Sequence, residues 1–456
     1  MVTTTIEETV TLSQAKAIIG SGAHSQSFLL LSPPGIGKSE LVRQTAAEAG
    51  LPCRSLLGTQ IAPEDVSGVP RIVGERSVFC PPRVLLPEDD QPFCLFLDEL
   101  PASSPDIQKA FYSLLLERRI GEHHLPDGTW VVAAGNRAED RALVRSISSA
   151  LVNRVVLLQL RHDVTEWLAW AEHANVRAEV TRFIQACPDA LLRPTPSESV
   201  PYSTPRAWVS LSRAIDLGLQ AGALDDETLL ALIAGRISDE DAFAFYDWFR
   251  AVQRVPETLD LGYTRLMSTE VDKLDLSNVA VQTLKAHGVY KVSQLVSKST
   301  NQLHAMKEKH GGCFGAVVDQ ARVDEISMAL ERKGLQLREV DQEAAPTITL
   351  AQAKLLIQAV GHRESLLLLS SPGIGKSSAI KQAADEQQMT CHSLLGTQIA
   401  PEDVSGIPTI QGERSVFCPP RVLLPEIPMP FYLFLDELPA CTPDIQKAFY
   451  SLLLER

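Results

Sequence analysis

The sequence predicts an α/β fold in which a parallel sheet is flanked by helices, and three observations support this prediction. The apolar run Phe28–Leu31 is followed by a Pro/Gly turn and then by a helical pattern from Glu40. Two later apolar runs, Phe93–Leu97 and Thr129–Ala134, also end in polar residues. Much of this arrangement occurs a second time in the chain. Buried parallel strands are typically continuous apolar runs, and ligand-binding groups follow their carboxyl ends.

Length and composition indicate a globular protein of several domains. The 456 residues suffice for about three domains. No apolar run reaches the ~20 residues that cross a membrane, and Met1–Glu8 lacks the basic and apolar regions of a signal peptide. The eight cysteines form no C-x-x-C pair, and Cys94 and Cys187 lie in apolar runs, as expected of reduced core thiols. We therefore expect a cytoplasmic protein with no membrane partner. The net charge of −14 argues against nucleic-acid binding over the whole surface, although a local site stays open.

An internal duplication organises the chain. Residues 11–118 align without a gap with residues 349–456. From Ser55 to Arg118 the two copies are identical at 55 of 64 positions. The period is far longer than a solenoid unit, so it indicates a duplicated domain.

The turn after the first apolar run has the composition of a phosphate-binding loop. Its glycines let several backbone N–H groups face one anion, and the next helix adds its positive end. We expect Lys38 to reach the β- and γ-phosphates of ATP and Ser39 to hold Mg²⁺. Ser32 replaces the usual first glycine, which a negative φ would allow. The alternative is a chance turn, and its recurrence in the second copy argues against that. The predicted nucleotide-binding residues here are Pro34, Gly35, Ile36, Gly37, Lys38 and Ser39.

Two carboxylates follow the second apolar run. Asp98 and Glu99 stand at the carboxyl end of a predicted parallel strand. We expect Asp98 to bind the nucleotide and to hold Mg²⁺ through water, so that Ser39 and Asp98 form the metal site. Glu99 would orient and deprotonate the attacking water. The alternative is a solvated strand end.

Three further residues are candidates for catalysis. Asn136 ends the third strand and is expected to hydrogen-bond the γ-phosphate or the attacking water, with a simple turn former as the alternative. Arg154 is a candidate arginine finger for a neighbouring subunit, a role that can contribute about 10³–10⁵ in rate. Arg145 is the second choice for that role, and a surface salt bridge is the alternative. Arg206 follows the predicted helix start Ser203–Pro205 and could reach a phosphate.

The remaining elements of this first part are predicted from periodicity and caps. A hairpin predicted over Val69–Phe79 is either a solvated turn or a loop that touches substrate. From Asp163 the pattern is helical, with Trp167, Trp170, Val180 and Phe183 as core positions. The other predicted elements are a helix over Thr11–Gly20, a hairpin over Val69–Phe79, a helix over Pro105–Arg118 and a strand over Val155–Leu160.

Taken in order, these motifs resemble the AAA+ ATPase module, specifically its MoxR-like branch in the dynein-related subgroup. The resemblance covers roughly residues 5–255. The matching motifs are Walker A at Ser32–Ser39, Walker B at Leu95–Glu99, sensor 1 at Asn136, the finger at Arg154, sensor 2 at Ser203–Arg206, and the family-like segment Pro63–Pro70.

This resemblance implies a P-loop AAA+ sheet in a first core (residues 1–160) and an α-helical lid (residues 161–255). It also implies ATP hydrolysis with Mg²⁺, a homo-oligomeric ring, and remodelling of a protein substrate. Many members act beside a von Willebrand A-type partner protein, so such a partner is expected as well.

Residues 262–340 have a different character. Five lysines between Lys285 and Lys309 face one acid, Glu308. The segment resembles the C-terminal domain of the RNA polymerase α subunit, which implies a small all-α domain like helix-hairpin-helix folds. Val279 replaces the minor-groove arginine of that family, and the turn at Gly311–Gly315 is longer, so DNA binding and protein docking both stay open. The matching residues are Leu274–Ser277, Leu284–Lys285, Gln294–Val296, Ser299, Leu303, Glu325–Ile326 and Gly334–Leu335.

The second core (residues 346–456) repeats the loop and the acidic pair but lacks the later motifs of the first. It has no counterpart of the Asn136 strand, the finger or the lid. In the AAA+ sheet that strand lies between the Walker A and Walker B strands. Without it, these two strands would keep unpaired backbone N–H and C=O groups. We expect an incomplete reading frame or a degenerate half-domain, active only if another chain supplies the strand. Its candidate nucleotide-binding residues are Gly373, Gly375, Lys376, Ser377, Asp436 and Glu437.

Two functions are consistent with these motifs. The first is an ATP-hydrolysing, MoxR-like ATPase that remodels or chaperones a protein as a ring. The alternative is a nucleotide-gated interaction module that docks to a protein or DNA-bound complex through residues 262–340 with little turnover. The complete set of Asp98, Glu99, Asn136 and Arg154 favours the first.

Overall fold

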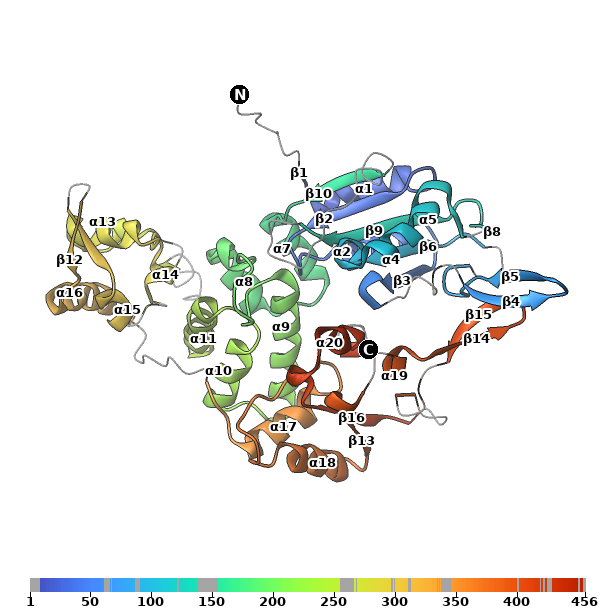
Figure 1. Ribbon diagram of the computed structural model, residues 1–456. Helices are drawn as coiled ribbons and strands as arrows, with labels where there is room; N and C mark the ends of the chain where they lie inside the picture. Colours follow the sequence, from blue (N-terminus) through green and yellow to red (C-terminus); the bar gives the residue numbers. More distant parts are fainter. Residues whose placement is uncertain are drawn as a thin grey trace. The chain divides into compact units, whose positions relative to one another are not determined.

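The chain forms two units, which are described separately. The first contains residues 1–163 and 365–456, and the second contains residues 164–364 (Figure 1). The computed structural model describes residues 9–453 except 61–65, 67, 87–90, 121–122, 138–154, 255–265, 268, 297, 299, 311–312, 334, 336, 338–345, 400–401, 419, 421–422, 425–428 and 450–451.

A six-stranded sheet forms the centre of the first core, with strand order β1-β10-β2-β9-β6-β3 (Figure 1). All neighbouring strands run parallel, which confirms the predicted fold class. The sensor-1 strand β9 lies between β2 and β6, as the resemblance implied. The strands are β1 (Thr9–Val10), β2 (Phe28–Ser32), β3 (Cys53–Leu57), β6 (Cys94–Asp98), β9 (Trp130–Asn136) and β10 (Val156–Leu160).

Helices and short turns connect these strands. Helix α1 (Leu12–Gly22) begins at Thr11, whose side chain forms a capping box with Gln14. The helix predicted over Pro105–Arg118 is divided at Phe111 into two shorter helices. The predicted hairpin is confirmed as β4 and β5, which pair antiparallel. The other elements are α2 (Lys38–Glu48), η1 (Gly58–Gln60), β4 (Val69–Val73), β5 (Arg76–Cys80), η2 (Leu100–Ala102), α4 (Pro105–Ala110), α5 (Tyr112–Glu117), β7 (Arg119–Ile120) and β8 (His123–His124).

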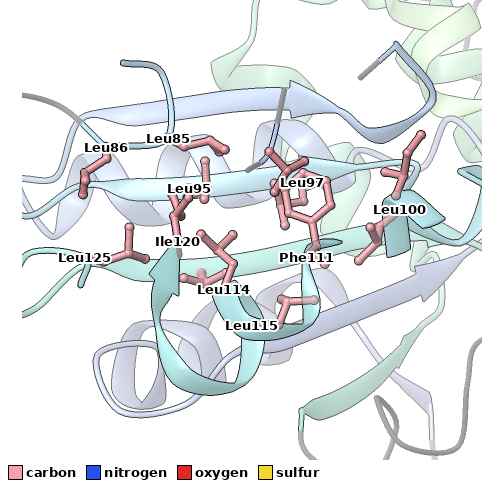
Figure 2. Packing of buried hydrophobic residues seen from close by; sticks show 14 of the residues in the cluster. Leu85, Leu86, Leu95, Leu97, Leu100, Phe111, Leu114, Leu115, Ile120 and Leu125 are labelled. Carbon is pink, nitrogen blue, oxygen red and sulfur yellow. The ribbon is translucent and has the colours of Figure 1, made fainter. Parts of the chain in front are cut away.

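A buried apolar cluster fixes β6 against the helices that come after it in the chain. Figure 2 shows Leu95 and Leu97 of β6 packed with Phe111 and Leu114. Each such side chain contributes roughly 1.5–3 kcal/mol by leaving water. Because alternate residues of β6 are anchored in this way, the position of Asp98 at the end of the strand is fixed as well.

Seven described cysteines form no disulfide: Cys53, Cys80, Cys94, Cys187, Cys391, Cys418 and Cys441. Cys94 is fully buried and lies opposite Cys53 on the neighbouring strand. A hydrogen bond with the Cys53 thiol and burial both raise the pKa of Cys94. This thiol therefore stays protonated, as expected of a structural core residue.

The described residues of the second core keep local strand pairings of the first core but form no wide sheet. Its strands β13 and β16 pair parallel, as β3 and β6 do. Residues 366–370, which correspond to β2, are described but form no strand. The elements are α18 (Lys376–Glu386), β13 (Thr390–Leu395), η6 (Gly396–Gln398), α19 (Glu402–Ser405), β14 (Ile407–Gln411), β15 (Arg414–Cys418), β16 (Phe431–Asp436), η7 (Leu438–Ala440) and α20 (Pro443–Ala448).

The second unit is mainly helical. Phe183, Trp208, Phe245 and Trp248 are fully buried together, with ring centroids 5.2–6.1 Å apart in the contacting pairs. The predicted core residue Trp170 is only half-buried. The helices are α7 (Val164–His173), α8 (Ala178–Ala186), η4 (Pro188–Ala190), α9 (Pro205–Gln220), α10 (Asp226–Ala234), α11 (Asp239–Arg254), η5 (Val271–Lys273), α13 (Asn278–Ala286), α14 (Val292–Val296), α15 (Thr300–His304), α16 (Gln320–Glu331) and α17 (Leu350–Val360).

The expectation of an all-α middle domain is wrong in one respect. Strands β11 (Lys307–His310) and β12 (Cys313–Val317) pair as an antiparallel hairpin. The segment contains Phe314 and Val317, which favour strands, and its glycines disfavour a helix. Among the helices in the described part of the chain, none has the length and apolar character needed to cross a membrane.

Candidate functional site

The candidate site begins at the loop between β2 and α2. Gly35 and Gly37 have φ values of 76° and 110°, in the left-handed region that glycine adopts without strain. Gly37 directly precedes the first turn of α2. Ser32, at the position of the missing glycine, is not among the described residues with positive φ, which confirms that the turn tolerates serine there. The loop therefore points backbone N–H groups and a helix N-terminus at one place.

Lys38 extends across the loop toward β9. Its ammonium donates to Ser32 Oγ at 2.9 Å and to Asn136 Oδ1 at 3.1 Å. Only 8% of the residue is exposed. Ser32 and Asn136 are register partners on the paired strands β2 and β9, so the sheet itself sets this spacing. The structure thus brings Lys38 and Asn136 together, and the hydroxyl at position 32 gains a role that the sequence pattern did not suggest.

The acidic pair lies on the other side of the same loop. The Ser39 hydroxyl donates to Asp98 Oδ2 at 2.8 Å. The second carboxylate oxygen of Asp98 accepts from the Glu99 backbone N–H at 2.9 Å. Ser39, Asp98, Lys38 and Asn136 therefore converge at the carboxyl edge of three adjacent strands, β2, β9 and β6. That edge is where open α/β sheets bind ligands.

Glu99 has an unusual backbone and an unpredicted partner. Its φ is 53°, a left-handed conformation that is uncommon for a residue other than glycine. The Thr59 hydroxyl, in η1, donates to Glu99 Oε2 at 3.2 Å. Thr59 was missed because no chemical role was assigned to residues 59–68, a run that overlaps the family-like segment Pro63–Pro70. Its unchanged recurrence in the second copy was the one available signal.

The donors at Ser39 and Asp98 suit a magnesium ion. A hydroxyl oxygen and a carboxylate oxygen at 2.8 Å are hard oxygen ligands, and Mg²⁺ in nucleotide sites typically takes one or two protein oxygens besides phosphate and water. The described residues contain no cluster of three or more His, Cys, Asp or Glu that could hold a metal. The site therefore fits an ion that arrives with a phosphate ligand rather than one held by the protein alone.

The second core repeats the loop geometry in an open setting. Gly373 and Gly375 have φ values of 80° and 102°. Lys376 donates to Ser370 Oγ at 3.0 Å, and Ser377 donates to Asp436 Oδ2 at 3.3 Å. Glu437 has a left-handed φ of 55°, close to that of Glu99. The loop and the acidic pair are therefore brought together here too, without an asparagine beside the lysine among the described residues.

Two of the predicted catalytic arginines are not placed by the structure, and a third lies in the second unit. Arg154 and Arg145 lie outside the described residues. Arg206 is the second residue of α9, exposed, and belongs to the second unit. The cap predicted for this helix is confirmed, since the Thr204 side chain accepts from the Ala207 N–H at 3.1 Å. The catalytic roles of the three arginines stay predictions.

The lysines of the middle segment are partly neutralised. Lys285 donates to Asp272 at 2.6 Å, and this contact raises its pKa. Lys291 lies 3.8 Å from Asp189. Two of the five lysines thus have acidic partners within their own unit, which weakens the argument for a DNA-binding surface.

Comparison with known proteins gives one family match, and it falls mostly within the first core. Residues 27–166 match the AAA domain of the dynein-related subfamily. A search of curated proteins gives no match. Among solved structures, the chain is similar to the RuvB Holliday junction branch migration motor of Thermotoga maritima, with 16% identity and a TM-score of 0.32 over 72% of this chain and 95% of that chain. A mutant of Thermotoga maritima RuvB gives 16% identity and a TM-score of 0.30 over 69% and 91% of the two chains.

Proposed function

We propose that the AAA domain at residues 27–166 binds ATP with Mg²⁺ and hydrolyses its terminal phosphoanhydride bond. One observation carries the proposal. Lys38, Ser39, Asp98 and Asn136 meet at a single sheet edge through hydrogen bonds of 2.8–3.1 Å. A structural salt-bridge network would not need a glycine loop and a helix N-terminus at the same place.

The loop and Lys38 bind the triphosphate in this proposal. Backbone N–H groups at Gly35–Gly37 surround the β-phosphate, and Lys38 reaches the γ-phosphate. In the structure Lys38 is satisfied by Ser32 and Asn136, so phosphate oxygens would take over one of these contacts. Ser39 and Asp98 would hold the magnesium ion, which neutralises charge on the phosphate oxygens when bound.

Glu99 is the proposed general base. Its backbone is left-handed, and the hydrogen bond from Thr59 orients its carboxylate. Glu99 would accept a proton from the water that attacks the γ-phosphate. Asn136 would hold that water or a γ-phosphate oxygen.

Two substitutions separate binding from chemistry. Glu99→Gln should keep ATP affinity while lowering turnover by about 10²-fold or more, because general base catalysis contributes about 10²–10⁴. Lys38→Ala should weaken ATP binding itself. Lys16→Ala is a matched control, since Lys16 is a surface residue paired with Glu48. Fluorescent nucleotide binding and steady-state phosphate release measure the two effects, and a Glu99→Gln variant with parental turnover would refute the assignment.

The finer proposal is a MoxR-like ring that remodels a protein substrate, with Arg154 acting on the nucleotide of the next subunit and Arg206 sensing it from the lid. A finger supplied by a neighbour makes the specific ATPase rate rise with protein concentration, and Arg154→Ala should remove that rise. A chain that binds ATP but shows negligible turnover at every concentration would instead support the nucleotide-gated interaction module. Co-purification with a von Willebrand A-type protein would test the expected partner.

A further inference from the structure

The hairpin of the second core is hydrogen-bonded to the first core, and both cores belong to the first unit. The Ser415 backbone N–H donates to the Pro81 carbonyl at 3.0 Å, and the Arg83 N–H donates to the Ser415 carbonyl at 2.9 Å. Ser415 thus bonds to the two neighbours of Pro82, its partner in a parallel bridge. The contact is therefore a short strand pairing, in which β15 adds to an edge segment of the first core.

Two arginine side chains add hydrogen bonds between the cores. Arg414, in β15, donates through Nε to the Leu86 carbonyl at 3.0 Å, and Arg71, in β4, donates to the Gly412 carbonyl at 2.8 Å. A charged donor makes such bonds stronger than those between neutral groups. Thr409 stands at the position of Arg71 in the second core. The sequence difference therefore gives the contact a direction, in which the first core receives the hairpin of the second.

Matched positions of the two cores differ in burial at this contact. Both hairpins carry the same Gly-Glu-Arg-Ser turn. Ser415 is 3% exposed, whereas its counterpart Ser77 is exposed. Leu86, in the segment that receives the hairpin, is 4% exposed, whereas its counterpart Leu424 is 61% exposed. The same residue types are therefore buried at the contact and exposed in the other copy.

A second contact between the cores lies next to the proposed general base. Helix α20 lies beside η1, with Cα atoms within 8 Å of one another. Thr59 of η1 donates to Glu99 Oε2 at 3.2 Å. The neighbouring Gly58 packs on the same strand end, since a Cβ there would lie 3.3 Å from the Asp98 carbonyl oxygen. The short turn η1 therefore connects the second core to the Glu99 carboxylate.

We propose that the second core is an internal regulator of the first. Its hairpin docks on the receiving segment, residues 81–86, and the docked core holds η1 in the position from which Thr59 orients Glu99. This regulation rests on the ATPase activity proposed above. Release of the hairpin withdraws α20 from η1, so the base is less well placed and turnover falls. ATP affinity stays the same, because the phosphate-binding loop itself is unchanged.

Amide hydrogen exchange in the full chain tests docking without ATP hydrolysis. The Arg83 N–H, whose acceptor is in the second core, should exchange slowly at every protein concentration, because the contact is within one chain. Ser415→Pro removes the N–H that pairs with Pro81, so it should speed exchange at Arg83 at least tenfold and in η1 at least threefold. Ser77→Pro, the same change in the first hairpin, should alter neither. Fast exchange at Arg83 in the parent chain, exchange that slows as concentration rises, or equal effects of the two proline substitutions would overturn the proposal.

Steady-state kinetics test the consequence for catalysis. Arg414→Ala should lower kcat at least fivefold with the Kd for ATP unchanged, while Arg76→Ala, the matched change in the first hairpin, should leave both at parental values. A parental or higher kcat in an Arg414→Ala chain whose Arg83 amide exchanges fast would refute the control of Glu99 by the second core. Absence of turnover in the parent chain would refute the ATPase proposal instead, and exchange in η1 would still decide whether docking holds this turn.

Discussion

Gly135→Ala should damage catalysis through a contact that lies outside the reacting groups. Gly135 is the next-to-last residue of β9, and a Cβ there would lie 2.4 Å from Pro101 Cδ and 2.5 Å from Cγ. Ordinary van der Waals contact begins at 3.4 Å, so β9 or η2 must move by about 1 Å. The Pro101 ring is rigid and buried. Pro101 follows Glu99 by two residues, and Gly135 directly precedes Asn136. The shift therefore displaces both Glu99 and Asn136.

The expected magnitudes are set by this geometry. Overpacking of a buried site typically costs about 1–3 kcal/mol, so the free energy of unfolding should fall by that amount. A misplacement of about 1 Å in a catalytic constellation can cost about 10²-fold in rate, so turnover should fall by a similar factor. ATP affinity should change less than turnover, because the substitution does not alter Lys38 or the loop glycines.

Urea denaturation and steady-state phosphate release measure these effects. Gly20→Ala is the control, since its added methyl group lies 3.8 Å from Thr45 Cγ2, an ordinary contact, and alanine favours the helix. Pro101→Ala removes the two clashing ring carbons, so it should partly rescue Gly135→Ala in a double-mutant cycle. Parental stability and turnover in Gly135→Ala, or strictly additive effects in the cycle, would show that this contact does not position the site.

Three other substitutions give separable outcomes. Ser39→Ala should raise the Mg²⁺ concentration that gives half-maximal ATPase activity about tenfold, whereas Ser39→Thr, which keeps the hydroxyl, should not. The same Mg²⁺ dependence in Ser39→Ala and the parent chain would contradict the metal site. Asp241→Asn should destabilise the chain by about 3–5 kcal/mol in urea, because Asp241 is 2% exposed and accepts from Arg193 Nε at 3.0 Å. Burial acts to raise the pKa of Glu325, but hydrogen bonds that include one from Arg322 outweigh it and lower the pKa. The contribution of Glu325 to the free energy of unfolding is therefore fully present above the unfolded pKa of about 4.3, and it is lost as the pH falls through the lower pKa of the folded state. Glu325→Gln should remove this part of the acid transition, which circular dichroism measures.

The sequence was sufficient for the parts of the site that depend on local geometry and strand polarity. Continuous apolar runs identified β2, β6 and β9, and parallel strands place their carboxyl ends on one edge. The hydrogen bond between Ser39 and Asp98 therefore confirms a proximity that could be predicted from the motifs. The hairpin β4–β5 was likewise predictable from alternation around Gly74 and Glu75.

The parts that could not be predicted depend on contacts between segments with no sequence signature. Thr59 reaches Glu99 across 40 positions of the chain, and a lone threonine after a strand carries no expectation of such a contact. The close approach of Gly135 to Pro101 is similarly invisible, because a glycine in a strand normally weakens it. The hairpin of β11 and β12 was missed because a resemblance to a helical domain outweighed the local strand propensity.

Comparing the two cores shows which structural features a short segment forms by itself and which features require neighbouring strands. The loop glycines, the left-handed glutamate and the hairpin recur in both, because turns and hairpins satisfy their hydrogen bonds within a short segment. The leucine run before the loop does not. The run is a buried strand in the first core, whereas residues 366–370 in the second core form no strand and are partly exposed. The hydrogen bonds of a parallel strand go to other strands, so the run alone does not determine this structure. The phosphate-binding half of this site is thus encoded by the loop alone. The half that contains Asn136 depends on β9, which pairs with β2 and β6 in the first core, so nucleotide turnover is expected there.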